Sequence, residues 1–165
     1  MNFGAFVRAL SFSLGVFAKV FCLLLVHCLF SSIVFAEITI DLNVIKTIES
    51  EGNPRAVNIA TRCYGLYQIS EICLEDFNQT HQTRYAVKDL FEPKINEMIA
   101  SWYFGRIKEM LRFYDIPITL TTLIATFNWG IGHVRAWYAK GMRTEGLPAE
   151  TRGYIKKYSK LTRAD

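Results

Sequence analysis

A helical spacing of apolar residues, interrupted by isolated Pro and Gly residues, constrains the fold of this chain more than any other feature. After residue 37, apolar side chains recur every three or four residues, as on one face of an α-helix. Pro and Gly stand singly between these segments, so they begin and end helices and form no linker. The pattern predicts helices over residues 40–50, 70–78, 93–114, 120–127, 131–139 and 148–161. Residues 56–68 lack it and are expected to be irregular or a small hairpin, which makes the chain mainly α.

The first 36 residues have a different composition from the rest. They contain no Asp or Glu, and residues 20–36 are mostly apolar. Val34 and Ala36 occupy the positions of small residues before a cleavage site, so the segment predicts a secretory signal peptide. The alternative is an uncleaved N-terminal anchor, although the apolar run contains His27 and is short of the roughly 20 residues that span a membrane.

Removal of this segment would leave residues 37–165 as one exported domain. Of the 19 Lys and Arg residues, two precede residue 37, so the remainder carries 17 − 15 = +2 formal charges. Such a small excess does not indicate a nucleic-acid partner. We expect the protein in the periplasm or elsewhere outside the cytoplasm, or attached to the membrane if the leader is retained.

Two cysteines, Cys63 and Cys73, lie in the part that would be exported. Oxidising compartments favour disulfides, so this pair predicts a bridge, with two separate free thiols as the alternative. Two cysteines without a nearby pair of histidines do not supply the four ligands of a zinc site. No metal and no cofactor are expected.

Glu49 is the candidate catalytic residue. Neither histidine of the domain, His81 or His133, has the Ser or Cys neighbours of a nucleophile motif, and no Gly-rich phosphate loop is present. Glu49 ends the first predicted helix, just before a Gly-Asn-Pro turn. The negative end of a helix dipole disfavours an ionised carboxylate and raises its pKa, which suits a general acid. A lone Glu on such a helix is nevertheless more often only solvated.

Four sequence blocks follow one another from Glu49 onward. They are Glu-Ser-Glu-Gly-Asn-Pro-Arg-Ala with Gly-Leu-Tyr-Gln-Ile (49–56 and 65–69), Leu-Phe-Glu-Pro-Lys-Ile-Asn-Glu (90–97), Ala-Thr-Phe-Asn-Trp-Gly-Ile-Gly-His-Val (125–134) and Leu-Pro-Ala-Glu-Thr-Arg-Gly-Tyr (147–154). In this order and spacing they resemble the signature of lytic transglycosylases with a lysozyme-like fold. The resemblance spans about residues 44–158 and implies a lysozyme-like single domain with Glu49 as the catalytic acid/base.

The resemblance also implies a reaction. Cleavage of the β-1,4 bond between N-acetylmuramic acid and N-acetylglucosamine needs a proton on the leaving oxygen, which Glu49 would supply. Glycosidases that use water normally need a second carboxylate. Residues 52–70 contain none. In the family, the N-acetyl group of the substrate assists instead, the acid then acts as base toward the C6 hydroxyl, and a 1,6-anhydro end forms.

Three polar residues near Glu49 are candidates for substrate binding. By resemblance, Gln68 would bond the sugar or position Glu49, and Asn58 would face the acetamido group. A role of Gln68 in closing the hairpin is equally open. Ser50 is included among the site residues, although a bond to local backbone at the helix end is the stronger expectation.

Further site candidates lie where the chain matches or departs from the family. Tyr67 replaces the family's Met and is expected to form a cleft wall. Phe127 replaces a Tyr, so a hydroxyl near the acid is lost; Tyr154 could compensate by bonding Glu49 or the substrate. Asn128 is expected to tie backbone in the helix turn beside the cleft. The tryptophans are expected mainly in the core, with Trp129 the best candidate for a sugar-stacking surface.

The sequence thus predicts an exported enzyme that cleaves peptidoglycan glycan strands. By analogy it would open the wall for an envelope-spanning secretion or conjugation machine, and a phage or general turnover role is equally open. One alternative is a hydrolase of the same bond, like goose-type lysozyme, with Glu51 or Glu71 as the second acid. Another is a peptidoglycan-binding or scaffold protein that has lost turnover, which Phe127 makes conceivable.

Overall fold

The computed structural model describes residues 38–163, in which the first helix, α2 (Leu42–Ser50), leads directly to the candidate acid. Asp41 caps its start, because its carboxylate accepts a hydrogen bond from the backbone N–H of Asn43 at 2.8 Å. The helix ends at Ser50, and the next residue, Glu51, caps it with a φ of 54°, in the left-handed region. Glu49 therefore sits in the last turn, with the apolar face of α2 directed into the core.

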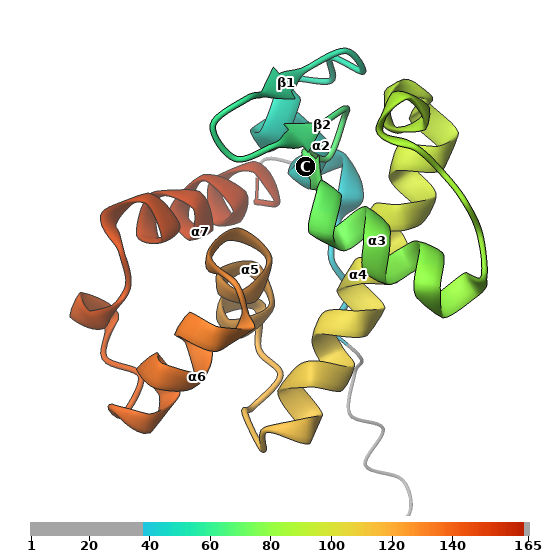
Figure 1. The fold of residues 1–165 in the computed structure, drawn as a ribbon. Helices are drawn as coiled ribbons and strands as arrows, with labels where there is room; N and C mark the ends of the chain where they lie inside the picture. Colours follow the sequence, from blue (N-terminus) through green and yellow to red (C-terminus); the bar gives the residue numbers. More distant parts are fainter. Residues whose placement is uncertain (1–37, 164–165) are drawn as a thin grey trace, which may run out of the picture. The chain divides into compact units, whose positions relative to one another are not determined.

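A small antiparallel sheet follows α2 (Figure 1). Its strands are β1 (Val57–Asn58), β2 (Cys63–Tyr64) and β3 (Ile69–Ser70), in the order β1-β2-β3. Tyr64 pairs with Val57 on one side and with Ile69 on the other. The expected small hairpin is thus a three-stranded sheet with strands of two residues each.

The side chain of Asn96 bonds the sheet to the helical part of the domain. It is fully buried, and its amide nitrogen donates to the carbonyls of Tyr64 (2.9 Å) and Leu90 (2.8 Å). Its amide oxygen accepts from the N–H of Tyr67 at 2.8 Å. Gly65 makes room for this contact: its φ is +78°, and a Cβ there would lie 2.2 Å from the Leu90 oxygen.

The remaining helices match the sequence pattern closely. They are α3 (Glu71–His81), the 3₁₀ turn η1 (Val87–Phe91), α4 (Pro93–Phe113), α5 (Leu120–Trp129), α6 (Ile131–Ala139), the 3₁₀ turn η2 (Thr144–Gly146) and α7 (Ala149–Leu161). Ser70 caps α3 as expected, since its hydroxyl accepts from the N–H of Cys73 at 3.2 Å. Pro93 occupies the first position of α4, where its missing N–H does no harm.

Helix α5 lies at the centre of the helical bundle, between α4, α6 and α7 (Figure 1). Leu123, Ile124 and Ala125 in its middle are completely buried. Helix α7 packs on both α5 and α2. The mainly α, lysozyme-like architecture expected from the sequence is confirmed, and it brings the end of α2, the sheet, the end of α5 and the start of α7 around one opening.

The predicted leader, residues 1–36, lies outside the described residues, so its expected role as signal peptide or anchor stays a prediction. Among the helices of residues 38–163, none combines the length and the apolar character that a membrane-crossing helix requires.

Candidate active site

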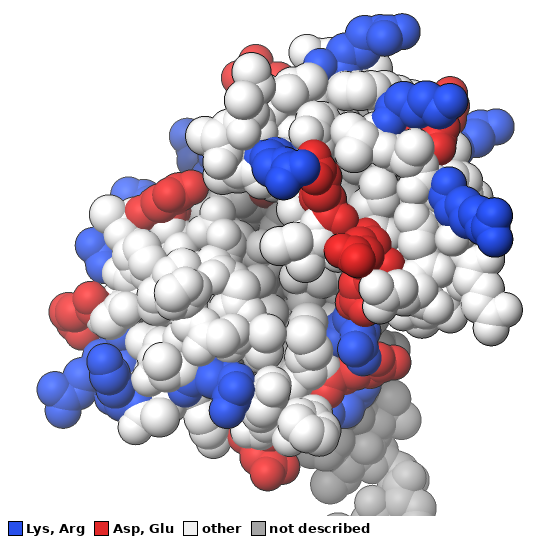
Figure 2. All heavy atoms as spheres, in the orientation of Figure 1, with Lys and Arg blue, Asp and Glu red and all other residues white. Residues whose placement is uncertain are grey.

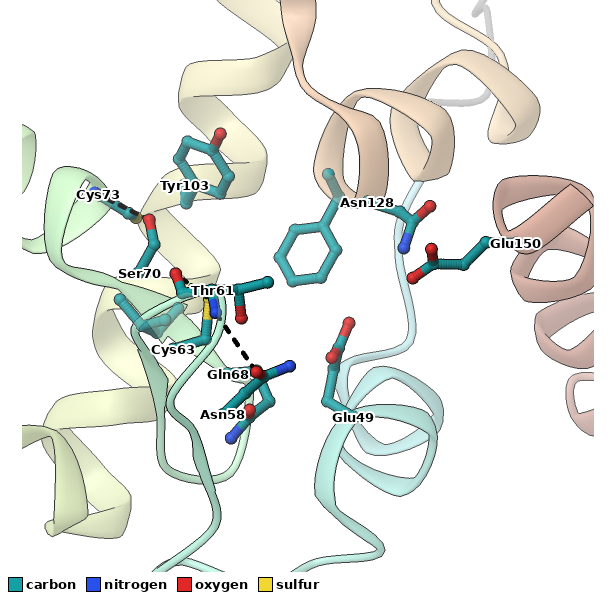
Figure 3. Close-up of a pocket in the computed structure, with 12 residues that line it drawn as sticks. Glu49, Asn58, Thr61, Cys63, Gln68, Ser70, Cys73, Tyr103, Asn128 and Glu150 are labelled. Atoms are coloured by element: carbon teal, nitrogen blue, oxygen red, sulfur yellow. Dashed lines mark hydrogen bonds between the residues drawn. The ribbon is translucent and has the colours of Figure 1, made fainter. Parts of the chain in front are cut away.

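A cavity of about 290 Å³ opens beside Glu49. On this face of the molecule, Figure 2 shows a recess next to the acidic side chains that gather over α3. Residues of the sheet, of the helices α2, α3, α4 and α5, and of the first turn of α7 line the cavity. Its lining residues are Glu49, Asn58, Thr61, Cys63, Gln68, Ile69, Ser70, Cys73, Tyr103, Phe127, Asn128 and Glu150 (Figure 3).

The carboxyl group of Glu49 is tuned toward its protonated form. Burial is the largest cause and raises its pKa from 4.5 to about 7, and the negative charge of Glu150 adds to the rise. A hydrogen bond from Tyr154 and the charge of Lys157 act in the opposite direction. The sequence predicted a raised pKa for Glu49, and the structure agrees. The main cause, however, is burial of the carboxyl group and not its position at the end of the helix. Near neutral pH, Glu49 can therefore both donate and accept a proton.

Tyr154 of α7 lies behind Glu49 and holds its carboxyl group. The phenol donates a hydrogen bond to Oε1 of Glu49 at 2.7 Å, across 105 positions of sequence. Tyr154 is itself buried, and both burial and the nearby charge of Glu49 raise the pKa of the phenol. The phenol therefore remains protonated, and a hydrogen-bond donor, near neutral pH.

Asn58 and Gln68 face Glu49 from the sheet side of the cavity (Figure 3). The side-chain nitrogen of Gln68 donates to the carbonyls of Gly65 (3.0 Å) and Ala56 (3.3 Å), which supports the hairpin-closing role. The oxygen of the Asn58 amide accepts from the N–H of Thr61 at 3.3 Å.

The end of α5 supplies the wall between sheet and α7. Phe127 lines the cavity and stacks on Phe104 with ring centroids 4.8 Å apart, so its ring is held by the core. Asn128 also lines the cavity, and its amide oxygen accepts from the hydroxyl of buried Thr151 at 2.7 Å. The expected backbone tie of Asn128 is thus a side-chain tie between α5 and α7.

Comparison with protein-family models gives one match. The model of the transglycosylase SLT domain matches residues 40–147, more than half of the chain. The chain belongs to this lysozyme-like lytic transglycosylase family. In the same comparisons, no curated protein and no solved structure matched. Family membership indicates that the substrate of this transglycosylase domain is the glycan of peptidoglycan. The match includes Glu49 and ends just before Glu150 and Tyr154.

Glu150 also lines the cavity, and the sequence analysis did not single it out as a site residue. Its carboxylate is turned toward Glu49 and Asn128 in Figure 3, and its charge raises the pKa of Glu49. One signal could have found it: Glu150 and Tyr154 are four residues apart, so they share a face of α7.

The other acids considered from the sequence lie elsewhere in the transglycosylase domain. Glu51 is exposed and Glu71 is bonded to Arg62 and to the hydroxyl of Tyr64 (2.9 Å), and neither lines the cavity.

Two of the proposed substrate-binding residues are not in the cavity of this transglycosylase. Tyr67 is only 1% exposed and packs in the core, because Asn96 draws its backbone inward, so its expected place in the cleft wall is wrong. Ser50 donates to the carbonyl of Leu66 at 2.8 Å and to that of Lys46 at 3.3 Å. Ser50 therefore joins α2 to the sheet, consistent with the backbone-bonding alternative.

The two cysteines of the transglycosylase domain both line the cavity, but neither is bonded to the other. Cys63 is partly buried and Cys73 is buried, and both are free thiols. Burial raises the pKa of the Cys73 thiol to about 12, so it is not a nucleophile near neutral pH. The disulfide expected of an exported chain is not formed in this structure and stays a prediction for the oxidised protein.

Within residues 38–163, no group of three or more His, Cys, Asp or Glu side chains is arranged to hold a metal ion.

Proposed function

We propose that the protein is an exported lytic transglycosylase that cleaves the β-1,4 bond between N-acetylmuramic acid and N-acetylglucosamine, with Glu49 as its single acid/base. The observation that carries the proposal is the state of Glu49: a carboxyl group in a cavity, with a pKa of about 7 and one oxygen held by Tyr154. A group with this pKa can serve in both proton transfers of the reaction.

The first step uses Glu49 as an acid. Because Tyr154 donates to Oε1, the proton of Glu49 is carried by Oε2, the oxygen that remains for the substrate. That proton goes to the leaving O4 of N-acetylglucosamine as the bond between C1 and O4 breaks. The Tyr154 hydroxyl then stabilises the carboxylate that forms, and the substrate's N-acetyl group stabilises the positive charge developing at C1.

The second step uses the same residue as a base. The Glu49 carboxylate takes the proton of the C6 hydroxyl of the muramic acid residue, and O6 bonds to C1. The product has a 1,6-anhydro end, no water is consumed, and Glu49 is protonated again. In this proposal Asn58 and Gln68 orient the sugar for the attack, and their place on the opposite side of the cavity supports that role.

The test is digestion of purified peptidoglycan, followed by mass spectrometry of the fragments. We expect fragments about one water lighter than those of a hydrolase, and we expect Glu49→Gln to lower the rate at least a thousandfold. Glu51→Gln is the matched control, since this exposed glutamate lies two positions away and outside the cavity, and it should leave the rate unchanged. Cleavage by Glu49→Gln at the parent rate would refute the assignment.

One observation favours a second candidate, a hydrolase that resembles goose-type lysozyme. Glu150 lines the cavity with Glu49, and a second carboxylate is what activation of a water molecule requires. Fragments that carry the additional water, together with loss of cleavage in Glu150→Gln, would establish this alternative. If the parent bound peptidoglycan without cutting it, the protein would be a binding or scaffold component.

Export and service to an envelope-spanning secretion or conjugation machine are further parts of the proposal. They are supported by the composition of residues 1–36 and by the analogy with compact wall-cleaving enzymes. Mass measurement of the protein recovered from the periplasm checks the first part: loss of residues 1–36 is expected, and an intact leader would indicate the anchored form.

A further inference from the structure

A second cavity, of about 510 Å³, lies beside α6. Most of its lining is aromatic or cationic, and we call it the α6 groove. The residues that define it are Trp129, His133, Trp137, Lys140, Arg143 and Gly146. Trp129 directly follows Asn128, which lines the catalytic cavity, so one turn at the end of α5 contributes to both cavities.

The groove contains a flat aromatic surface. The rings of Trp129 and His133 are stacked with an interplanar angle of 6° and centroids 4.9 Å apart. At that separation the rings are offset, so each leaves part of a face uncovered. Trp129 is partly exposed and His133 is exposed. An aromatic face with negative electrostatic potential suits the C–H groups on the face of a sugar ring.

Contacts within the protein hold another part of the groove's lining in place. Trp137 is only 4% exposed, and its indole N–H donates to the carbonyl of Arg143 at 2.8 Å. Gly146 lies against the same indole, where a Cβ would come within 2.9 Å of Trp137 Cδ1. The segment after α6 is therefore packed onto Trp137, and the groove is preformed, as ligand sites usually are.

Cationic side chains accompany the aromatic surface. Lys140 and Arg143 are exposed, and Glu145 is the one carboxylate among the groove's lining residues in the part of the chain that the structure describes. Figure 2 shows Lys and Arg side chains over the region of α6 and the segment that follows it. The groove thus fits a ligand that combines a sugar ring with carboxylate groups.

We propose that the α6 groove is a distal subsite for the peptidoglycan strand. A sugar of the strand stacks on Trp129 and His133, and a carboxylate of its peptide stem binds Lys140 and Arg143. The inference rests on the proposed function, because the same polymer has to reach both cavities. It assigns to this chain a preference for strands that retain their peptide stems.

The test measures binding to soluble glycan strands, with stems intact or removed by an amidase. All variants are made in full-length protein that also carries Glu49→Gln, so binding is measured without turnover. Trp129→Ala is expected to weaken binding of both strands about tenfold. The double variant Lys140→Gln/Arg143→Gln is expected to weaken only stem-bearing strands, about tenfold, and to reduce the dependence of binding on salt.

Matched controls separate the groove from the rest of the surface. Phe113→Ala removes an aromatic ring that is 78% exposed at the C-terminal end of α4, and Lys88→Gln/Lys94→Gln removes two exposed cations; none of these residues lines the groove. Both controls should bind like the parent. Circular dichroism and melting check that each variant is folded; the cation variants change only exposed side chains, so they test the proposal even if Trp129→Ala unfolds.

The inference is overturned if folded Trp129→Ala binds both strands like the parent, or if the double cation variant binds stem-bearing strands like the parent. Failure of the proposed function looks different, because it is read from the protein with Glu49 intact. A protein that does not cleave but shows the expected binding losses would refute transglycosylase activity and retain the subsite. Normal cleavage by the parent, together with unchanged binding in the groove variants, would support transglycosylase activity and refute the subsite.

Discussion

At the scale of single residues, the burial of Glu49 favours catalysis but lowers the stability of the folded protein when the carboxyl group is ionised. Glu49 has a raised pKa chiefly because it is buried, and only one oxygen is stabilised by a strong donor, Tyr154. A fully exposed carboxyl group would be ionised at neutral pH and could not act as an acid. The same burial that makes Glu49 useful therefore makes its charged form unfavourable in the folded protein.

This compromise predicts a pH dependence of stability. Because the pKa of Glu49 is raised from 4.5 to about 7 on folding, the folded protein binds the proton more tightly than the unfolded chain. The stabilisation of the folded state by this proton is complete below pH 4.5 and is lost as the pH rises through about 7. Glu49→Gln, which cannot ionise, should be more stable than the parent by up to about 3 kcal/mol at pH 8, and the difference should vanish near pH 4. Denaturant unfolding at both pH values measures this.

Glu51→Gln is again the control for that measurement, since the side chain of Glu51 is exposed in the folded protein. Its stability should follow the parent at both pH values. A Glu49→Gln variant that is no more stable than the parent at pH 8 would mean that Glu49 is solvated in the folded state, and the acid role would lose its physical basis.

At the scale of elements, the sheet that carries Asn58 and Gln68 depends on packing against other elements. Its two-residue strands supply few ladder bonds, so the three hydrogen bonds of buried Asn96 stabilise it from outside. Asn96→Asp keeps the shape but places carboxylate oxygen against the carbonyls of Tyr64 and Leu90. We expect a loss of about 3 kcal/mol or more in the free energy of unfolding, by loss of two donors in a buried site.

The matched control for this variant is Asn43→Asp, at an exposed position of α2. It should change the free energy of unfolding by about 0.5 kcal/mol or less. Equal effects of the two substitutions, measured by chemical denaturation, would show that Asn96 does not hold the sheet.

How much the sequence predicted also differs between elements. The helices were predicted to within a few residues because each is long enough to repeat its apolar spacing several times. Strands of two residues show no alternation, so the sheet could be expected only as an irregular insert or hairpin. The resemblance to the family predicts Tyr67 in the cleft wall, and Ser50 is a site candidate next to Glu49 for which a bond to local backbone is the stronger expectation. Their actual positions follow from bonds to Asn96 and Leu66, which local sequence does not reveal.

At the scale of the whole described unit, residues 38–163, α7 closes the site although it lies after the part that matches the family model. Its Tyr154 reaches Glu49 and its Tyr158 accepts a hydrogen bond from the N–H of Asp41 at 2.8 Å, both at α2. Its Thr151 reaches Asn128 at the end of α5. One helix thus connects the two elements that carry the acid and the opposite wall.

This arrangement predicts that the family-matched segment is insufficient by itself. A chain that ends at Leu147 would expose the core surfaces of α2 and α5 that α7 covers, and would lose the buried side chains Thr151, Tyr154 and Tyr158. Since burying one large aromatic side chain contributes roughly 1.5–3 kcal/mol, that loss approaches the whole stability of a domain of this size. We expect no cooperative melting transition and no cleavage.

A chain that ends at Thr162 is the control, because it retains all of α7, and it should melt and cleave peptidoglycan like the full chain. The two truncations separate the contributions of α7. If the chain that ends at Leu147 still melted cooperatively but had lost activity, α7 would act only through Glu150 and Tyr154 in the cavity. If that chain retained activity as well, neither residue would take part in the reaction, and the tuning of Glu49 would have to come from α2 and α5 alone.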